Sequence, residues 1–341
     1  MKATIPEKFS GSILGGMLGD AIGAVVEGES SGYIQKTFKN ADEILCLESV
    51  EELFGGKWQV GRFTDDTQMS LCVAEWLLNE EKLDGKSLLS RFSHAYHPAR
   101  RYGPGAGMIL EAFPKHQDKW EALATMMFPQ GSYGNGSAMR VGPVGLYFHN
   151  DLPGLRTIAR ISSTTTHSHW LAIQGAVLQA TAVALATRAG GEIEVEQFLK
   201  VLELSLSHFE ESGDDTTVYK KALKTISQGL SVRFPPAKVA HILGTGIKAQ
   251  EAVPMAIYCF LANKDSFEKA VEEAVFLGGD TDTIAAMTGT ISGAYLGVGQ
   301  IPQKWLNRIQ EDSYSPKRVC VIADSLYKKA LKHGFKRQQS R

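Results

Sequence analysis

Apolar residues recur at helical spacing along almost the whole chain, and this periodicity limits the possible folds more than any other feature of the sequence. The segment Thr67–Leu78 is a clear case, because its apolar side chains lie three or four positions apart. The other segments with this spacing are His169–Thr187, Val195–Phe209, Lys220–Leu230, Ser266–Leu277, Ile284–Leu296 and Asp324–Lys332. No run alternates with period two for long, and no Asn-Gly turn joins two strand-like segments. The sequence therefore predicts an all-α fold, a compact bundle of roughly a dozen helices.

The first helical segment has glycine at every fourth position. The four residues are Gly11, Gly15, Gly19 and Gly23. This spacing places them on one face, where another backbone can approach closely. Each glycine costs about 1 kcal/mol relative to alanine in a helix, so close packing must compensate. Asp20 interrupts the apolar run Ser12–Val26, which is also too short to cross a bilayer, so we predict a buried helix here.

No Pro- or Ser-rich linker divides the chain, so we predict one domain over residues 1–341. Its core spans about residues 11–300, and residues 301–341 form a helical tail that ends in the basic stretch Lys328–Arg341. Loops are expected at Glu29–Trp58, Pro98–Gly107, Pro114–Lys119 and Gly131–Gly136.

Charge and cysteine content narrow the class of protein. The chain has 36 Lys and Arg against 37 Asp and Glu, and this balance excludes the broad basic field of a general nucleic-acid binder. Its 4 cysteines form no C-x-x-C pair, which argues against a zinc ribbon or a disulfide framework. We therefore expect a cytoplasmic monomer with no membrane and no direct nucleic-acid partner.

Two clusters of oxygen-bearing side chains give the strongest chemical signal. Residues 64–67 (TDDT) and 278–283 (GGDTDT) each precede a helical segment. Either cluster could cap its helix, but a cap needs one such residue. Buried together, the carboxylates would need a cation, and oxygen ligands without Cys or His favour Mg²⁺ or Mn²⁺ over zinc. Two clusters suit a binuclear centre.

Glycine-rich stretches between the clusters are candidate ligand-binding loops. Gly131–Arg140 (GSYGNGSAMR) could hold phosphate through backbone N–H groups. It is not a P-loop, because the Gly-Lys-Ser/Thr element is absent, and an ordinary turn is the alternative. Arg100–Gly107 carries Tyr102, which could stack on a base or pack in a surface loop. His167 follows the hydroxyl run Ser162–Thr166 and is a candidate phosphate contact or helix-start residue.

Five motifs in collinear order resemble the ADP-ribosylglycohydrolases, also called ADP-ribosyl-acceptor hydrolases. They are GDAIGAxxE (Gly19–Glu27), FTDDTQM (Phe63–Met69), SYGNGSAMR (Ser132–Arg140), THS (Thr166–Ser168) and GGDTDT (Gly278–Thr283). The resemblance implies an all-α fold and two Mg²⁺ ions, with Mn²⁺ as a substitute. It also implies hydrolysis of the bond between C1″ of ADP-ribose and an acceptor, which releases ADP-ribose. The partners would be ADP-ribosylated proteins or small-molecule conjugates.

The resemblance also implies roles for single residues. The metal ligands would be Thr64, Asp65, Asp66, Asp280, Asp282 and Thr283, with Asp282 as the bridging carboxylate. The adenosine would lie against Tyr102, Gly103, Gly105 and Gly107. The diphosphate would be held by Ser132, Tyr133, Gly134, Asn135, Gly136 and His167. The catalytic candidates are Glu27, which would gate the site or move a proton, Asp65 and Asp282.

Two other functions stay open at this point. One is a catalytically silent ADP-ribose-binding module, and the other is a different Mg²⁺-dependent hydrolase of nucleotides or phosphate esters. The complete ligand set favours an enzyme, and the glycine-rich loops favour an intact diphosphate used as a handle. The acceptor could be O-linked serine, N-linked arginine, poly(ADP-ribose) or O-acetyl-ADP-ribose. The loop Ser132–Gly136 resembles the branch acting on O-glycosidic bonds, and Glu29–Trp58 is expected to shape acceptor choice.

Overall fold

The helical periodicity of the sequence is realised almost throughout the computed structural model, which describes residues 2–51, 57–310 and 313–339. Within this part, thirteen α-helices have eight or more residues. They are α1 (Ile5–Gly23), α4 (Asp65–Asn79), α5 (Gly85–Ala95), α6 (Pro104–Ala112), α10 (Leu152–Thr164), α11 (Trp170–Arg188), α12 (Val195–Glu211), α13 (Thr217–Val232), α14 (Pro236–Leu243), α15 (Ala249–Ala262), α16 (Phe267–Phe276), α17 (Thr281–Leu296) and α19 (Pro316–Gln339). The prediction of an all-α bundle of roughly a dozen helices is confirmed.

Shorter elements connect these helices. The short α-helices are α2 (Ser31–Thr37), α3 (Ala41–Leu45), α7 (Trp120–Leu123), α8 (Gly136–Met139), α9 (Gly142–Tyr147) and α18 (Gln303–Leu306). Single 3₁₀ turns are η1 (Pro98–Arg100), η2 (Phe113–Lys115), η3 (Gln117–Lys119) and η4 (Val298–Gln300). The two strands, β1 (Ser49–Glu51) and β2 (Lys57–Gln59), pair antiparallel.

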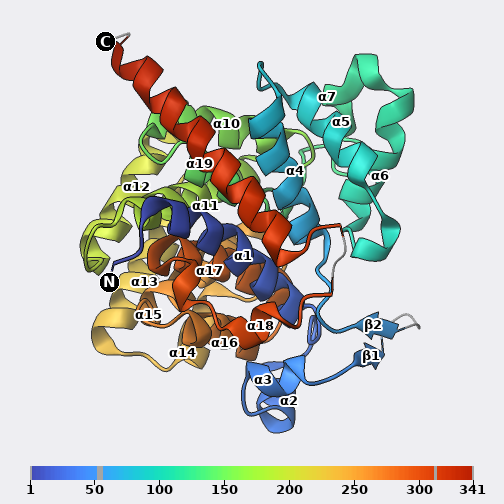
Figure 1. Cartoon of the computed structure of the whole chain (residues 1–341). Coiled ribbons are helices and arrows are strands. Elements are labelled where there is room, and N and C mark those ends of the chain that lie inside the picture. Colours follow the sequence, from blue (N-terminus) through green and yellow to red (C-terminus); the bar gives the residue numbers. More distant parts are fainter. Residues whose placement is uncertain (1, 52–56, 311–312, 340–341) are drawn as a thin grey trace.

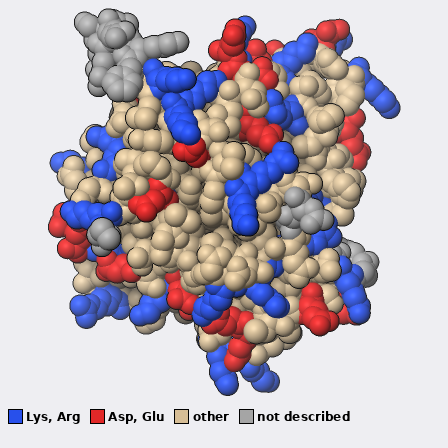
Figure 2. Space-filling view, in the orientation of Figure 1, with Lys and Arg blue, Asp and Glu red and all other residues tan. Residues whose placement is uncertain are grey.

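The centre of the bundle is α11, which packs against α8, α9, α10, α12, α15 and α17. It is long and apolar enough to cross a membrane, but 83% of its apolar stretch is buried inside the protein, as expected of a core helix. On the near face, α19 runs across α1 and α4 (Figure 1), and its Val319, Ala323 and Leu326 are fully buried. Figure 2 shows basic and acidic side chains interspersed on this face, in keeping with the balanced charge.

The glycine face of α1 packs directly on α17, which confirms the predicted close helix contact. A β carbon at Gly15 would lie 2.3 Å from the carbonyl oxygen of Gly289, and one at Gly19 would lie 2.0 Å from that of Ala285. The contact is reciprocal, because a β carbon at Gly289 would lie 2.2 Å from the Gly15 oxygen. Only glycine allows the two backbones to approach so closely.

This contact is antiparallel, and it sets the position of the candidate site. The start of α1, at Gly11, faces Gly293 near the end of α17, whereas Gly23 faces Thr281 at the start of α17. The residues that follow α1 therefore lie beside the first turn of α17. Glu27 and the second acidic cluster are brought together in this way.

Some of the predicted loops contain regular structure. Within Glu29–Trp58, α2 and α3 are capped by the side chains of Ser30 and Asn40, and β1 pairs antiparallel with β2. Residues 52–56 of this predicted loop lie outside the described residues. In the predicted loop Pro98–Gly107, Pro104 is the first residue of α6, where its missing N–H costs nothing. The capping residues and Pro104 can be read from the sequence, but these segments are too short to show a helical period, so they were predicted as loops.

Candidate active site

The first acidic cluster is held in place by a buried carboxylate on α1. Asp20 is fully buried, and its two carboxylate oxygens accept hydrogen bonds from the backbone N–H groups and the hydroxyls of Thr64 and Thr67, at 2.6–3.1 Å. Burial raises the pKa of Asp20 to about 6, although these hydrogen bonds oppose the shift. Asp20 thus orients the start of α4. This role was not predicted from the sequence, although Asp20 stands in the first motif.

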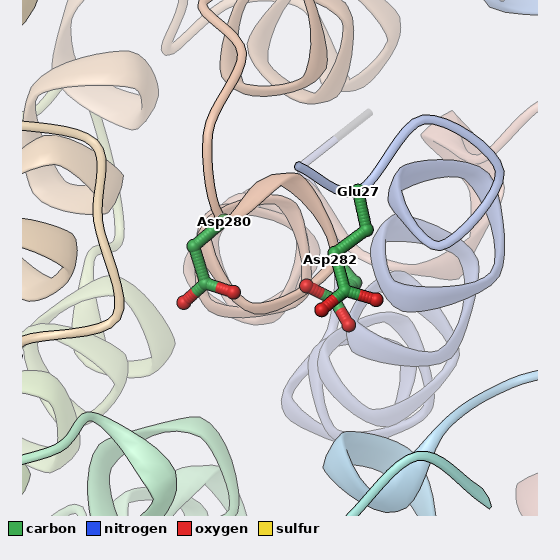
Figure 3. A group of neighbouring side chains, drawn as sticks. All are labelled: Glu27, Asp280 and Asp282. Atoms are coloured by element: carbon green, nitrogen blue, oxygen red, sulfur yellow. The ribbon is translucent and has the colours of Figure 1, made fainter. Parts of the chain in front are cut away.

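The two predicted acidic clusters meet, although they lie far apart in the sequence. The hydroxyl of Thr283 donates to a carboxylate oxygen of Asp66 over 3.4 Å. On the other side, ligand oxygens of Glu27, Asp280 and Asp282 lie within 4.8 Å of one another. Figure 3 shows these three carboxylates gathered in one space, Glu27 from the segment after α1 and the aspartates from the start of α17.

The crowding of these carboxylates favours a bound cation. Burial, and then the neighbouring carboxylates, raise the pKa values of Asp65, Asp66 and Asp282 well above the ordinary range. Burial likewise raises the pKa of Asp280 to about 6. The Oδ1 atom of Asp66 is buried and has no partner within the described part of the chain. An oxygen-only donor set with an unsatisfied carboxylate oxygen fits a hard divalent cation.

The predicted phosphate loop is anchored beside this centre. The backbone N–H of Asn135 donates to the carbonyl oxygen of Ile247 at 2.9 Å, and the backbone N–H of Ala249 donates to the carbonyl oxygen of Tyr133 at 3.0 Å. The side-chain amide of Asn135 donates to Asp280, so the loop and the second acidic cluster are directly linked. The loop is therefore tied both to the start of α15 and to one candidate metal ligand.

His167 lies directly against this loop. A β carbon at Gly136 would lie 2.6 Å from the imidazole Cε1, and one at Gly134 would lie 3.3 Å from Nε2. The imidazole is buried, and burial together with the nearby Arg140 guanidinium lowers the pKa of His167 to about 3. At neutral pH the ring is therefore uncharged.

One cavity, of about 250 Å³, joins these groups. The sequence-predicted residues that line it are Glu27, Asp65, Asp66, Gly103, Gly105, Ser132, Gly134, Asn135, Gly136, His167, Asp280, Asp282 and Thr283. Its concave shape, with carboxylates at one side and a glycine-rich loop at another, suits a small charged ligand.

Four other predicted residues lie near the cavity but outside its described lining. Thr64 is fully buried behind the first cluster, hydrogen-bonded to Asp20. The hydroxyl of Tyr102 donates to Gln68 at 2.7 Å, and its ring packs edge-on against Tyr96. Gly107 lies inside α6 rather than in a loop, and Tyr133 is exposed beside His169.

The family comparison decides what kind of site this is. The sequence model of the ADP-ribosylglycohydrolases matches residues 1–335. The chain belongs to the ADP-ribosylglycohydrolase family. It is 34% identical to the ADP-ribosylhydrolase ARH3 of Gallus gallus over 335 residues, which cover 88% of each chain. It is 25% identical to the ADP-ribosylarginine hydrolase Tri1 of Serratia proteamaculans over 348 residues, covering 96% of this chain and 81% of that one.

A solved structure supports the same assignment. The chain resembles an "ADP-ribosylglycohydrolase-related protein complex" with a TM-score of 0.66 and 28% identity, over 96% of this chain and 99% of that one. The protein is therefore a glycosyl-bond hydrolase that acts on ADP-ribosyl groups. The catalytically silent binding module is accordingly disfavoured.

Part of the cavity wall of this ADP-ribosylglycohydrolase was not predicted from the sequence. The apolar lining includes Met127 and Phe128, which are exposed, and Ile247, which is 70% exposed. Their signal was weak, because apolar side chains in a short loop form no periodic pattern. Such exposed apolar residues beside a polar cavity are typical of a ligand-binding rim.

Arg101 is another residue of the site that was not predicted from the sequence. Its guanidinium donates to Glu27 at 3.2 Å and to the carbonyl oxygen of Ala24 at 2.7 Å, and it lies 4.1 Å from the ring centroid of Trp58. Trp58 belongs to β2, so the segment Glu29–Trp58, expected to shape acceptor choice, reaches the site through this stacking contact. Arg101 therefore fixes the position of Glu27.

Replacing Arg101 by alanine is expected to lower kcat/KM for ADP-ribose release roughly tenfold, because Glu27 loses a charged partner that orients it. Steady-state kinetics would measure the effect. Arg101→Lys should recover part of the loss, since lysine keeps the charge but not the planar fork. An unchanged kcat/KM in Arg101→Ala would mean that Glu27 needs no such support.

Proposed function

We propose that this enzyme hydrolyses the bond between C1″ of ADP-ribose and an O-linked acceptor, with two Mg²⁺ ions, and releases ADP-ribose. The observation that carries the proposal is the single cavity in which both acidic clusters, Glu27 and the Ser132–Gly136 loop meet. Hydrolysis of an ADP-ribosyl bond can use the diphosphate as a handle and needs a polar centre at the reacting carbon. This cavity offers both.

The ADP part of the substrate would be held in the cavity by two kinds of contact. The loop from Ser132 to Gly136, with His167 above it, would bind the diphosphate. Phe128, which lines the cavity and is 43% exposed, offers an aromatic face for adenine. Tyr133, at 46% exposed, is a second candidate at the rim, whereas the packing of Tyr102 against Tyr96 leaves it a supporting role.

The metal ions would be held by the predicted ligands. These are Thr64, Asp65, Asp66, Asp280, Asp282 and Thr283, and Glu27 lies within reach of the second group. Bound Mg²⁺ would orient ribose hydroxyls and offset negative charge that develops on the leaving atom. Mn²⁺ satisfies the same oxygen ligands. The unsatisfied Oδ1 of Asp66 supports this assignment.

Protein groups would position the reactants and move the proton. Glu27 is half-buried, faces the cavity and is held by Arg101, so it can accept a proton from water or deliver one to the departing acceptor. Asn135 fixes Asp280 relative to the phosphate loop. This link would keep the phosphate loop at a fixed distance from the candidate metal ligands, which helps to orient the bound substrate.

The choice of an O-linked acceptor rests on resemblance. The loop Ser132–Gly136 resembles the branch acting on O-glycosidic bonds, and the relative named as an arginine hydrolase is the less similar of the two, at 25% against 34% identity. We propose that the acceptor enters past Glu27 and Arg101, which line the same cavity as the phosphate loop.

Two matched peptides test the proposal, one ADP-ribosylated on serine and one on arginine, each assayed with Mg²⁺ and with EDTA. Release of ADP-ribose from the serine peptide alone, abolished by EDTA, is the expected result. Release from the arginine peptide alone would reverse the acceptor assignment. Release that survives exhaustive chelation would contradict the metal assignment, and products cleaved at the diphosphate would favour a phosphate-ester hydrolase.

A further inference from the structure

A buried guanidinium lies behind the candidate phosphate site with no ion pair to an acidic side chain in the described part of the chain. Arg140, at the C-cap of α8, is fully buried. One terminal nitrogen donates to the carbonyl oxygen of Gly136 at 3.1 Å and to the hydroxyl of Thr166 at 2.9 Å. The other donates to the carbonyl oxygen of Ser162 and to the hydroxyl of Thr165. Arg140 thus joins the phosphate loop to the end of α10.

The hydroxyl of Thr166 connects this guanidinium to His167. Thr166 Oγ1 lies 2.7 Å from Nδ1 of His167 and 2.9 Å from Arg140. A guanidinium can only donate hydrogen bonds, so it occupies a lone pair of the Thr166 oxygen. The hydroxyl proton is then free to point at Nδ1, which is the one acceptor within reach of it among the described residues.

The opposite arrangement is less favourable. If Nδ1 carried the proton and donated to Thr166, the hydroxyl proton would have no acceptor among the described groups, and Thr166 is only 1% exposed to water. A buried donor without a partner costs about 1–3 kcal/mol. The hydrogen-bond pattern therefore favours the tautomer in which Nδ1 accepts and Nε2 carries the proton.

The other ring nitrogen faces the ligand side. A β carbon at Gly136 would lie 2.9 Å from Nε2 of His167, and one at Gly134 would lie 3.3 Å from it. All three residues line the cavity. A proton on Nε2 therefore lies beside the glycine-rich loop at the cavity, where we expect a phosphate oxygen to accept it.

We propose that Arg140 and Thr166 are positioning residues that hold His167 as the Nε2–H tautomer, so that this N–H is a fixed donor to the diphosphate of the substrate. The inference rests on the proposed function for the identity of the ligand. It gives a role to Thr166, the last of the hydroxyl residues before His167, and to Arg140, which follows the phosphate loop.

Nuclear magnetic resonance of the full-length protein, labelled with ¹⁵N in its histidine rings, tests the tautomer directly. Long-range ¹⁵N–¹H correlations distinguish a protonated ring nitrogen from an accepting one, and the His167 signals are identified by their loss in His167→Gln. We expect an accepting Nδ1 and a protonated Nε2 at pH 7, and a shift of the Nε2–H signal on addition of ADP-ribose. A protonated Nδ1 would overturn the inference.

We call the hydrogen-bonded series Arg140–Thr166–His167 the relay. Three variants distinguish its control of the His167 tautomer from simple structural support. Thr166→Val removes the hydroxyl, and we expect a mixture of tautomers and a KM raised about tenfold with kcat less affected. Thr166→Ser should restore the Nε2–H tautomer and bring KM back toward that of the wild type. Thr165→Val is the matched control, because Thr165 also accepts from Arg140 and is fully buried but makes no hydrogen bond to the imidazole. An unchanged tautomer in Thr166→Val would contradict the relay.

The spectroscopic test is independent of catalysis. If no ADP-ribosylated peptide is cleaved but the Nε2–H tautomer is found and depends on Thr166, the relay stands and the proposed function fails. If ADP-ribose is released but Nδ1 carries the proton, the proposed function stands and the relay is refuted.

Discussion

Replacing Asp282 by asparagine is expected to lower kcat for ADP-ribose release about 10³-fold, because the proposed bridging carboxylate can then no longer hold charge between two metal ions. Asparagine has nearly the same shape, and its amide oxygen can still accept the 2.8 Å hydrogen bond from the amide of Thr283. The fold should therefore survive. Peptide hydrolysis and circular dichroism would measure the two effects, and full activity in the variant would exclude Asp282 as a metal ligand.

The same substitution, Asp282→Asn, should raise the stability of the metal-free protein although it lowers kcat. Burial, followed by the charges of Glu27 and Asp280, raises the folded-state pKa of Asp282 above its unfolded value. The stability that the protonated form contributes is present below the unfolded pKa, about 3.9, and is lost as pH rises through the folded pKa. In EDTA at pH 7.5, Asp282→Asn should therefore melt at a higher temperature than the wild type.

Metal addition separates these effects. Mg²⁺ at about one hundred times its Kd adds about 2.7 kcal/mol to the unfolding free energy for each site, so the wild type should gain thermal stability. Asp282→Asn should lose most of this gain. The exposed Asp118, in η3, supplies the control: Asp118→Asn should keep the Mg²⁺-induced increase in full. An equal increase in both variants would contradict the ligand role of Asp282.

Replacing Gly19 by alanine is expected to lower the free energy of unfolding by about 3 kcal/mol, the upper part of the usual range for overpacking. The new β carbon would lie 2.0 Å from the carbonyl oxygen of Ala285 and 2.3 Å from its carbonyl carbon. Neither is a side-chain atom that could rotate away, so α1 and α17 must separate. Urea unfolding would measure the loss.

A glycine-to-alanine substitution at an open helical position should instead raise the free energy of unfolding. A β carbon added at Gly32, in α2, would have no other atom within 4 Å, so Gly32→Ala gains helix propensity of up to about 1 kcal/mol without a clash. Gly19→Ala should also reduce activity, since α1 and α17 together place Glu27 beside Asp282. If both variants were equally stable, the close packing of α1 on α17 would be refuted.

The local chemistry of the site could be predicted from the sequence because it depends on residue type and short spacing. Asp65-Asp66 and Asp280-Thr281-Asp282 supply hard oxygen ligands wherever they lie, and a buried group of charged carboxylates is costly without a cation. The helical period likewise reports a local property. The short elements within Glu29–Trp58 escaped because they contain too few residues to show a period.

Long-range contacts could not be predicted in the same way. The sequence did not reveal that Asp20 would orient the start of α4, since one aspartate within an apolar run has many candidate partners. Nor could it reveal that Arg101 would stack on Trp58 and donate to Glu27. It also could not reveal that Tyr102 would donate a hydrogen bond to Gln68 while Phe128 lines the cavity. These outcomes depend on side-chain directions that only the assembled bundle defines.

The glycines of α1 show where the division lies. By itself the sequence determined that Gly11, Gly15, Gly19 and Gly23 share one face, because a helix repeats every 3.6 residues, and that this face must meet another backbone. Only the tertiary structure decided that the partner is α17 and that the two helices run antiparallel. The physical reason is that periodicity constrains a helix along its own axis, whereas the choice of neighbour is settled by packing across the whole core.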